Sequence, residues 1–464
     1  MSTRAIVLAA GMGTRMKSAT PKVLHPICGR PMLWYTLRAL ADAGVGEIVI
    51  VTNPQVDAAI EPLARDFSAR TVIQAPQRGT GHAVQVALAA LAPATGTIVI
   101  AYGDMPLVTP AIFEDVLADV DADAGTVLAL VTARMPLPSN FGRIVRQSGG
   151  SAQSASSGSA PSGVVKIVEA RDCTPAELAI DEMNAGIYAF DESNLRAVIE
   201  KLRDTNAQRE LYLTDTVEIL IEAGRRVVPV VADDYRAVLG VNDRVELANA
   251  RAALNRTLCE RHMRAGVTIV DPATTYLEPD LVIAADVTIH PNTTLGGATA
   301  VGTGSEIGPN TRLHGARVGA NCAIRESIVV DAQIGDHTRV GPFAHIRGGS
   351  IVEERVHIGN FVELKKTTMR ADAKAGHLAY LGDGIIGERA NIGAGTIFCN
   401  YDGTNKNTTT IGADAFIGSN SSLVAPITIG EGALTGAGTV AIRDIAPGER
   451  VVGNPGRPLP APSA

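Results

Sequence analysis

The feature that most constrains this chain is a six-residue repeat in its second half. A branched aliphatic residue followed by glycine recurs there, and such dipeptides come in pairs whose members are six residues apart. The pairs begin at Val301 and Ile307, Ile334 and Val340, Ile386 and Ile392, and Ile411 and Ile417. A period of six indicates a parallel β-helix, in which the aliphatic side chain points inward, the next residue is small so that the chain can turn, and three repeats complete one triangular coil. A glycine-rich β-sandwich would show alternation with a period of two instead.

The period slips at two places, between Ile358 and Ile386 and between Ile392 and Ile411. We expect the extra residues, within 374–383 and 400–406, to leave the coil as loops, and loops on a regular solenoid are where function is placed. The first loop contains His377, whose side-chain type can take a proton from an ammonium nucleophile near neutral pH. The alternative is a histidine with only a structural or surface role.

The first 240 residues have a different pattern. Short apolar runs at 5–9, 47–51 and 97–101 alternate with segments of helical spacing at 31–43 and 81–91. This alternation predicts a doubly wound, Rossmann-like α/β sheet with right-handed crossovers. Ligands in such sheets bind beyond the carboxyl ends of the strands. We therefore expect a first domain at 1–242 and a β-helix domain at 267–464.

Two further segments complete the organisation. Residues 243–266 are rich in Ala and Arg, begin with Asp and end with Gly, which predicts a linking helix. Residues 148–163 are nearly all Ser, Gly and Ala and cannot form a core, so they are expected to be a passive insertion in the first domain, with gating of a site as the alternative.

Composition excludes several classes of protein. A length of 464 residues predicts at least two domains, and the net charge of −7 argues against non-specific binding to nucleic acid. No apolar run approaches the roughly 20 residues of a membrane-spanning helix, and the N-terminus lacks a signal-peptide pattern. The five cysteines form no C-x-x-C pair, which argues against a disulfide framework or a cysteine zinc site. We expect a cytoplasmic protein.

A glycine-containing loop follows the first apolar run. The segment 8–16 reads L-A-A-G-M-G-T-R-M, and Pro21 and Lys22 follow shortly after it. Small residues let backbone N–H groups approach a polyphosphate, while Arg15 and Lys22 offset its charge. The pattern resembles the nucleotidyltransferases that join sugar-1-phosphates to nucleoside triphosphates. A tight turn between strand and helix is the alternative for G-x-G alone.

The same resemblance assigns roles to further residues. Gln74 and Ala75, together with Gly79, Thr80, Gly81 and His82, resemble that family's uracil-recognising loop. Asp104 and Asn242 would hold Mg²⁺, although Asp104 alone could be a helix cap or a solvated turn residue. The implied reaction is in-line attack of the sugar phosphate on the α-phosphorus of UTP, promoted by charge neutralisation by Arg15, Lys22 and Mg²⁺. The implied UTP and sugar-nucleotide contacts are Leu8, Ala9, Ala10, Gly11, Lys22, Gln74, Gly79, Thr80, Tyr102, Gly103, Asp104, Gly142, Glu169, Asn184 and Asn242.

The β-helix half carries a second resemblance. Together with 359–366 and 391–396, the two expected loops resemble the family of bifunctional N-acetylglucosamine-1-phosphate uridyltransferases and glucosamine-1-phosphate acetyltransferases. That family has a left-handed β-helix, forms homotrimers and makes UDP-N-acetylglucosamine, a precursor of peptidoglycan and lipopolysaccharide-type polymers. The resemblance makes His377 the general base and acetyl-coenzyme A the donor. It places glucosamine-1-phosphate on Arg347, Lys365, Tyr380 and Asn391, and acetyl-coenzyme A on Ala394, Asn400, Tyr401, Ser419 and Ala437.

One position departs from the family pattern. An Arg that often helps to hold coenzyme A is replaced here by Asn454, and Arg457 is a candidate substitute. Three other assignments remain open. They are a nucleotidyltransferase for another sugar phosphate with a regulatory β-helix, a β-helix that only trimerises the chain, and a β-helix zinc hydratase. The last would use converging histidines, for which His337, His345, His357 and His377 are available without that family's H-x4-H spacing.

Overall fold

The computed structural model describes residues 2–122, 125–147 and 163–453. Nearly all of the Ser/Gly-rich insertion at 148–163, together with Asn454 and Arg457, therefore lies outside the described residues. The chain divides into two compact units, Met1–Leu254 and Asn255–Ala464.

The first unit is built on a mixed sheet with the strand order β11-β7-β10-β6-β1-β4-β5. β1 pairs in parallel with β4 and β6, β4 pairs in parallel with β5, and β10 runs antiparallel between β6 and β7. The three apolar runs predicted as parallel strands are thus confirmed. The strands are β1 (Ser2–Leu8), β4 (Glu47–Thr52), β5 (Arg70–Ile73), β6 (Gly96–Tyr102), β7 (Thr126–Arg134), β8 (Arg143–Arg146), β9 (Val164–Val168), β10 (Glu182–Asp191) and β11 (Arg226–Val231), with a separate hairpin of β2 (Pro26–Ile27) and β3 (Arg30–Pro31).

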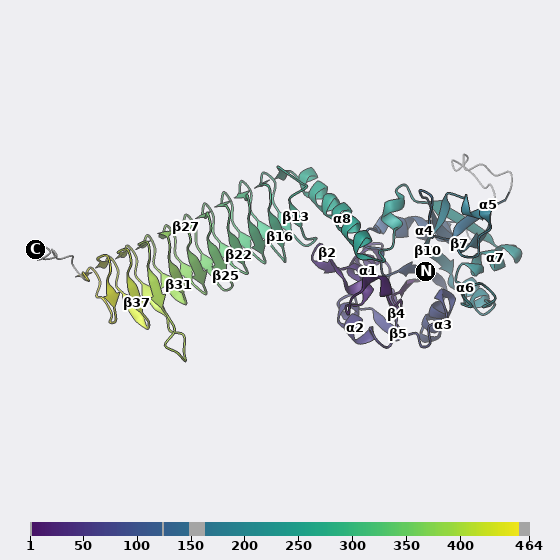
Figure 1. Cartoon of the computed structure of the whole chain (residues 1–464), viewed down its shortest axis with the longest axis horizontal. Coiled ribbons are helices and arrows are strands. Elements are labelled where there is room, and N and C mark those ends of the chain that lie inside the picture. The colour runs from purple at the N-terminus through teal and green to yellow at the C-terminus, as the bar shows by residue number, and fades with distance from the viewer. Residues whose placement is uncertain (1, 123–124, 148–162, 454–464) are drawn as a thin grey trace, which may run out of the picture. The chain divides into compact units, whose positions relative to one another are not determined.

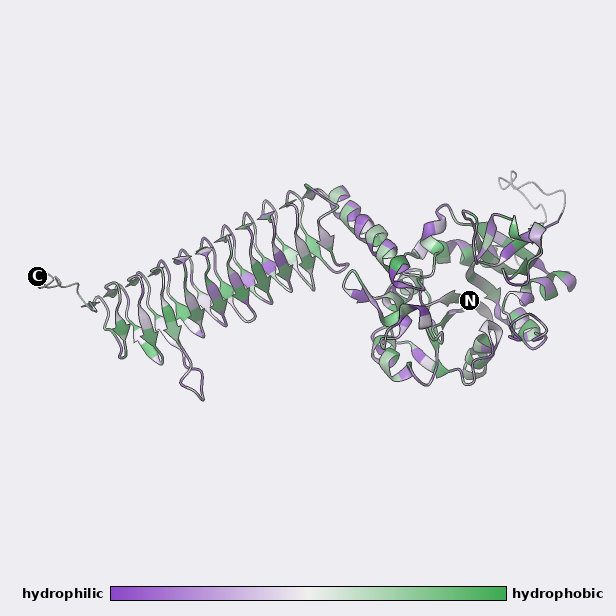
Figure 2. Ribbon diagram, in the orientation of Figure 1, coloured by the Kyte–Doolittle hydropathy of each residue, from purple (hydrophilic) through white to green (hydrophobic). Residues whose placement is uncertain are grey.

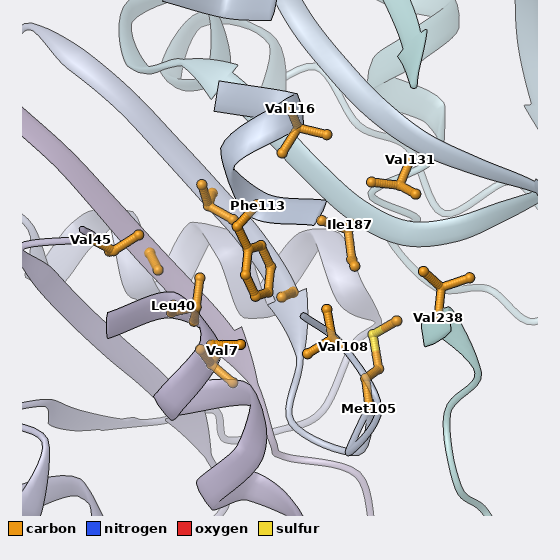
Figure 3. Close-up of a cluster of buried hydrophobic side chains, with 14 of the residues drawn as sticks. Val7, Leu40, Val45, Met105, Val108, Phe113, Val116, Val131, Ile187 and Val238 are labelled. Carbon is orange, nitrogen blue, oxygen red and sulfur yellow. The ribbon is translucent and has the colours of Figure 1, made fainter. Parts of the chain in front are cut away.

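Helices cover both faces of this sheet. Successive residues of a strand point to opposite faces, so neighbouring residues pack against different helices. Val7 and Val99 pack in a cluster with α1, α2 and α4, part of which Figure 3 shows around Phe113. Ile6 and Ile98 pack with α3, α6 and α7 in the other cluster. The helices are α1 (Met32–Asp42), α2 (Asp57–Asp66), α3 (Thr80–Ala90), α4 (Pro110–Ala122), α5 (Pro175–Leu178), α6 (Glu192–Ile199), α7 (Asp215–Glu222) and α8 (Arg244–Arg264), with 3-10 turns η1 (Thr14–Met16), η2 (Lys22–Leu24) and η3 (Tyr235–Val238).

The described residues of the second unit form three parallel sheets, which the chain visits in turn, as expected for a left-handed β-helix. Figure 1 shows the strands of one sheet stacked from β13 to β37.

The first of these sheets contains β12 (Thr268–Ile269), β15 (Thr288–Ile289), β18 (Glu306–Ile307), β21 (Ala323–Ile324), β24 (Arg339–Val340), β27 (His357–Asn360), β30 (Lys374–His377), β33 (Asn391–Ile392), β36 (Phe416–Ile417), β39 (Leu434–Thr435) and β41 (Arg450–Val451). The second contains β13 (Tyr276–Leu277), β16 (Thr294–Gly296), β19 (Arg312–His314), β22 (Ile328–Val330), β25 (His345–Arg347), β28 (Glu363–Lys365), β31 (Tyr380–Gly382), β34 (Ile397–Cys399), β37 (Ser422–Val424) and β40 (Val440–Ala441). The third contains β14 (Val282–Ile283), β17 (Ala300–Val301), β20 (Arg317–Val318), β23 (Gln333–Ile334), β26 (Ile351–Val352), β29 (Thr368–Met369), β32 (Gly384–Ile386), β35 (Thr409–Ile411) and β38 (Ile427–Ile429).

The hexapeptide pattern sets the inside of the coil. Aliphatic residues such as Ile307 and Ile358 are fully buried and stack on the equivalent residue of a neighbouring coil. The glycine that follows is required by the spacing between coils. A Cβ at Gly335 would lie 2.6 Å from the carbonyl carbon of Glu353, and a Cβ at Gly418 would lie 2.5 Å from that of Gly436. The small residue thus allows neighbouring coils to approach each other.

The two slips of the period have different structural causes. Ile358 pairs with Ala375, and Ala375 pairs with Ile392, so each coil here has seventeen residues. The expectation that 374–383 leaves the coil is therefore wrong, because the coil is shortened by one residue and Ile386 lies on a different face from Ile358. At the second slip Ile392 pairs with Ile417, twenty-five residues on, and the excess does leave the coil.

This extruded segment is closed by an antiparallel bridge between Tyr401 and Lys406. Figure 1 shows it standing out from the stack, and Figure 2 shows that its tip is hydrophilic. A loop over 400–406 is thus confirmed.

The second half of α8 packs against the first coil of the second unit. Asn255 donates to the carbonyl of Thr275 at 2.8 Å and accepts from the backbone of Leu277 at 3.0 Å. Cys259 and His262 on the same half of the helix are buried. The helix therefore covers the apolar end of the coil stack. No helix in the described part of the chain is long and apolar enough to cross a membrane.

Candidate functional sites

The first unit has a cavity of about 350 Å³ at the carboxyl ends of β1, β5 and β6. This is the edge where an α/β sheet binds its ligands. The structure brings most of the predicted nucleotide contacts together here. The predicted residues that line the cavity are Leu8, Ala9, Ala10, Gly11, Lys22, Gln74, Gly79, Thr80, Tyr102, Asp104 and Asn242.

The glycine loop folds back on Lys22. Gly13 has a φ of 61°, and a Cβ there would lie 2.6 Å from the Cβ of Lys22. A side chain at this position would meet both a strained backbone and a steric clash. Glycine therefore allows the loop and the lysine to share one edge of the cavity.

Lys22 lies between the two predicted metal ligands. Its ammonium forms an ion pair with Asp104 and a hydrogen bond of 3.2 Å with the side-chain oxygen of Asn242. The side-chain oxygens of Asp104 and Asn242 therefore face the same ammonium group. A carboxylate and an amide oxygen are ligands that Mg²⁺ accepts, with phosphate oxygens and water completing its shell. This pair of donors fits Mg²⁺, although the described residues contain no cluster of three or more His, Cys, Asp or Glu that could hold a metal.

The predicted sugar contacts gather beside Tyr102. A Cβ at Gly142 would lie 3.5 Å from a carboxylate oxygen of Glu169, and the carbonyl of Gly142 accepts from the backbone of Asn184 at 2.8 Å. The side-chain oxygen of Asn184 accepts from Gly186, and a Cβ at Gly186 would touch the Tyr102 ring. Gly142, Glu169 and Asn184 therefore form one group next to the cavity.

Burial controls protonation in this group. It raises the pKa of Glu169, against the opposing effect of a 3.2 Å hydrogen bond from the hydroxyl of Thr214. It also raises the pKa of Tyr102 far above its ordinary value, and the charges of Glu169 and Asp104 act in the same direction. The phenol thus stays protonated and can donate a hydrogen bond.

Besides the sugar contacts Gly142, Glu169 and Asn184, two further predicted residues, Arg15 and Gly103, do not line the main cavity. Arg15 is exposed and lines an adjoining hollow of about 380 Å³, which shares Asn242 with the main cavity. Gly103 lies behind the cavity wall, where its backbone N–H donates to the carbonyl of Leu8 at 3.0 Å. A Cβ at Gly103 would lie 2.8 Å from a methyl group of Leu33, so this glycine allows close packing.

The sequence analysis missed four residues that line the cavity, which are Val23, Gln77, Ala83 and Glu210. Gln77 donates to the carbonyl of Ala10 and lies in the predicted uracil loop, where its polar side chain was an available signal. Glu210 had no local signal. Glu210 lies at the cavity because the backbone of its neighbour Leu211 forms hydrogen bonds with Arg78 and Gly81, which are far away in sequence.

In the second unit, His377 is the last residue of β30 and is exposed at a corner of the coil. Its Nδ1 lies 2.6 Å from the side-chain oxygen of Asn360, one coil earlier. If that oxygen accepts, Nδ1 carries the hydrogen and Nε2 is free to take a proton. Asn360 was missed because its alignment with His377 depends on the seventeen-residue coil.

His377 begins a row that contains three predicted acetyl-coenzyme A contacts. Ala394, Ser419 and Ala437 lie at the equivalent corner of the next coils. Backbone hydrogen bonds link these corners, from Asn420 to the carbonyl of Ala394 and from Gly438 to that of Ser419. The predicted base and these three contacts thus follow one edge of the β-helix.

A group of cations occupies the neighbouring sheet. Arg347 and Lys365 are paired positions on β25 and β28, and Arg347 forms a 2.8 Å ion pair with Glu363. Lys406 of the extruded loop contacts Lys365, and this contact lowers the pKa of Lys365. Positive side chains held this close favour a bound anion, since its charge would relieve their repulsion. Lys406 was missed by the sequence analysis.

The remaining predicted residues are distributed along the same coils. Asn400, at the base of the extruded loop, donates to Asp383 at 2.6 Å, and its amide and the Tyr380 hydroxyl both lie close to Gly382. Tyr401 is exposed on the loop. Asn391 starts β33 on the sheet of His377. The structure thus brings together Tyr380 and Asn400.

Two models of known protein families match this chain, one in each half. The family model described as the MobA-like NTP transferase domain matches residues 5–148, and the model described as the GMPPB C-terminal domain matches residues 273–368.

Several curated relatives carry the name bifunctional protein GlmU. The relative from Streptomyces avermitilis is 42% identical over 449 residues, which cover 96% of this chain and 91% of that protein. The relative from Corynebacterium aurimucosum is 44% identical over 457 residues, covering 97% and 90%, and that from Trichlorobacter lovleyi is 43% identical over 444 residues, covering 96% and 94%. The chain belongs to the bifunctional GlmU family.

Proposed function

We propose that this chain makes UDP-N-acetylglucosamine in two steps, as a transferase with two active sites, and so supplies a precursor of peptidoglycan and related envelope polymers. The second unit would acetylate glucosamine-1-phosphate, and the first would transfer UMP from UTP to the resulting N-acetylglucosamine-1-phosphate. The observation that carries the proposal is the placement of Lys22, Asp104 and Asn242 around one point at the carboxyl edge of the sheet.

In uridyl transfer, an oxygen of the sugar phosphate attacks the α-phosphorus and pyrophosphate leaves. Lys22 would bind the α-phosphate, and Arg15, in the adjoining hollow, would meet the leaving pyrophosphate. Asp104 and Asn242 would hold Mg²⁺, which supplies charge neutralisation for the phosphate oxygens. Gly142, Glu169 and Asn184 would orient the sugar, so that positioning and charge account for most of the rate.

In acetyl transfer, the amine of glucosamine-1-phosphate attacks the thioester carbonyl of acetyl-coenzyme A, and coenzyme A leaves as the thiol. The free Nε2 of His377 would take the proton from the attacking amine. Arg347, Lys365, Tyr380 and Asn391 would bind the sugar phosphate. The donor would lie along the corner row, against Ala394, Asn400, Tyr401, Ser419 and Ala437.

We also propose a homotrimer formed by the β-helix. Support comes from an apolar ridge of three exposed residues, Phe343, Phe361 and Leu378, at one corner of successive coils. All three have positive φ, and the two phenyl rings stack with centroids 5.4 Å apart. Large apolar side chains in such strained, exposed positions are unfavourable unless another surface covers them.

The two-step assay tests the proposal directly. The protein would be incubated with glucosamine-1-phosphate, acetyl-coenzyme A, UTP and Mg²⁺, and UDP-N-acetylglucosamine would be measured by mass spectrometry. We expect the product only in the complete mixture, and N-acetylglucosamine-1-phosphate when UTP is omitted. An ADP-sugar formed from ATP without any acetylation would instead support the alternative nucleotidyltransferase.

A further inference from the structure

Gln74 has a side-chain orientation that the surrounding backbone determines. It follows β5, is only 4% exposed and lines the nucleotide cavity. Its side-chain nitrogen lies 2.9 Å from the carbonyl oxygen of Gly79. Because a carbonyl oxygen can only accept, the NH₂ group and not the oxygen of the amide must face Gly79.

The same nitrogen lies 3.1 Å from Nδ1 of His82. Since the amide nitrogen is a donor, Nδ1 must accept, which requires a neutral ring with its hydrogen on Nε2. Burial lowers the pKa of His82, and the charge of Arg78 lowers it further, so the neutral ring is favoured. His82 contacts Gln74 but is not among the residues that line the cavity.

Both hydrogens of the Gln74 amide are therefore engaged, by Gly79 and by His82. The group left for a ligand is the side-chain oxygen, which only accepts. Uracil carries a hydrogen on N3, whereas N3 of cytosine is itself an acceptor. We propose that His82 is a positioning residue that favours uracil over cytosine by holding the Gln74 amide with its oxygen free for the nucleobase. This inference rests on the proposed use of UTP.

The backbone at His82 is held independently of Gln74. His82 lies in the first turn of α3, where Gly81 donates to the carbonyl of Leu211 at 2.7 Å. The hydroxyl of Thr80 also accepts from the backbone of Leu213 at 3.0 Å. Changes to the ring of His82 should therefore leave the loop in place.

Two substitutions in the full chain separate the positioning role from packing. His82→Asn keeps an acceptor close to the position of Nδ1, whereas His82→Leu retains bulk without an acceptor. We expect the ratio of kcat/KM for UTP to that for CTP to fall about 10-fold in His82→Leu, the effect of one hydrogen bond, and to be retained in His82→Asn. Acetyl transfer and the thermal midpoint report folding, and His82→Ala replaces the Leu variant if the latter does not fold.

A double-mutant cycle tests whether His82 acts through Gln74. In a Gln74→Ala background, His82→Leu should leave the nucleotide ratio unchanged, because the amide to be positioned is absent. The inference is overturned if His82→Leu slows UTP and CTP equally, or if it changes the ratio by the same factor in both backgrounds. Failure of the wild-type protein to use UTP at all would instead overturn the proposed function.

Discussion

Among single residues, Asp104 and Asn242 matter because they come from distant parts of the chain and yet face the same ammonium group. Asp104 lies two residues after the end of β6, and Asn242 lies two residues before the start of α8. The backbone N–H of Val241 donates to the carbonyl of Asp104 at 2.9 Å, which ties the two segments together. Their side-chain oxygens are therefore held in place before any ligand arrives.

Replacing Asp104 with Asn should reduce uridyl transfer by about 100-fold or more, because the one charged ligand proposed for Mg²⁺ would be lost. The measurement is pyrophosphate release at limiting Mg²⁺. Acetyl transfer by the same preparation is the control and should be unchanged. Full uridyl transfer by this variant would exclude Asp104 as a ligand.

Replacing His377 with Ala should slow acetyl transfer by about 10²–10⁴-fold, the usual effect of losing a general base. Asn360→Ala should cause a smaller loss, since the ring is retained and only its orienting partner is removed. Release of coenzyme A at the wild-type rate in His377→Ala would show a structural histidine, and uridyl transfer is the control.

Among elements, the coil corners carry a ladder of charged residues. Arg355, Asp372, Arg389 and Asp414 lie on successive coils, and all have positive φ. Arg355 forms two hydrogen bonds with Asp372, and Arg389 forms two with Asp414 at 2.8 and 2.7 Å. The hydrogen bonds from Arg389 lower the pKa of Asp414.

Replacing Arg389 with Ala should destabilise the β-helix, because the pair is lost and the strained backbone is retained. Arg389→Gly should be less destabilising, since glycine adopts positive φ without strain. Because the pKa of Asp414 is depressed in the folded state, the pair stabilises the protein above the ordinary aspartate pKa of about 4, and this contribution is lost as pH falls below it. Denaturant unfolding at neutral and acid pH would measure both effects, and equal stability of the two variants would exclude backbone strain at this corner.

The same elements show where sequence-based prediction worked and where it did not. Aliphatic-glycine pairs identified the β-helix, because stacking requires both an inward side chain and a residue without Cβ. The six-residue period did not predict the coil at Ala375, where alanine occupies the inward position and the corner is one residue shorter. In the first unit, the loop after β1 was visible as a local motif, whereas Glu210 and His82 have roles that only the folded backbone creates.

For the whole molecule, α8 has a consequence for how the second unit can be isolated. We propose that the residues of acetyl transfer lie in 267–464, those of uridyl transfer in 1–242, and that 243–266 links them. A chain that starts at 267 would nevertheless expose the first coil that Asn255, Cys259 and His262 cover. Terminal repeats of solenoids need such a cap.

Fragments starting at 244 and at 267 should therefore differ. The longer fragment should be trimeric and acetylate glucosamine-1-phosphate, whereas the shorter one should unfold at lower temperature and aggregate through its open strand edge. Light scattering, thermal unfolding and coenzyme A release compare the two. A fragment of 1–266 should retain uridyl transfer as the complementary control. Equal stability of the two β-helix fragments would show that the helix is not needed as a cap. A longer fragment that is monomeric and fully active would show that acetyl transfer does not require the proposed trimer.

The spacing between coils determines the length of the corner row from His377 to Ala437. Each coil advances the row by one strand spacing, so the three steps span roughly 14 Å along the axis. A coil inserted between β30 and β39 would lengthen this track by about 4.8 Å without altering its cross-section. The length of the proposed donor site along the β-helix is thus adjustable only in increments of one coil.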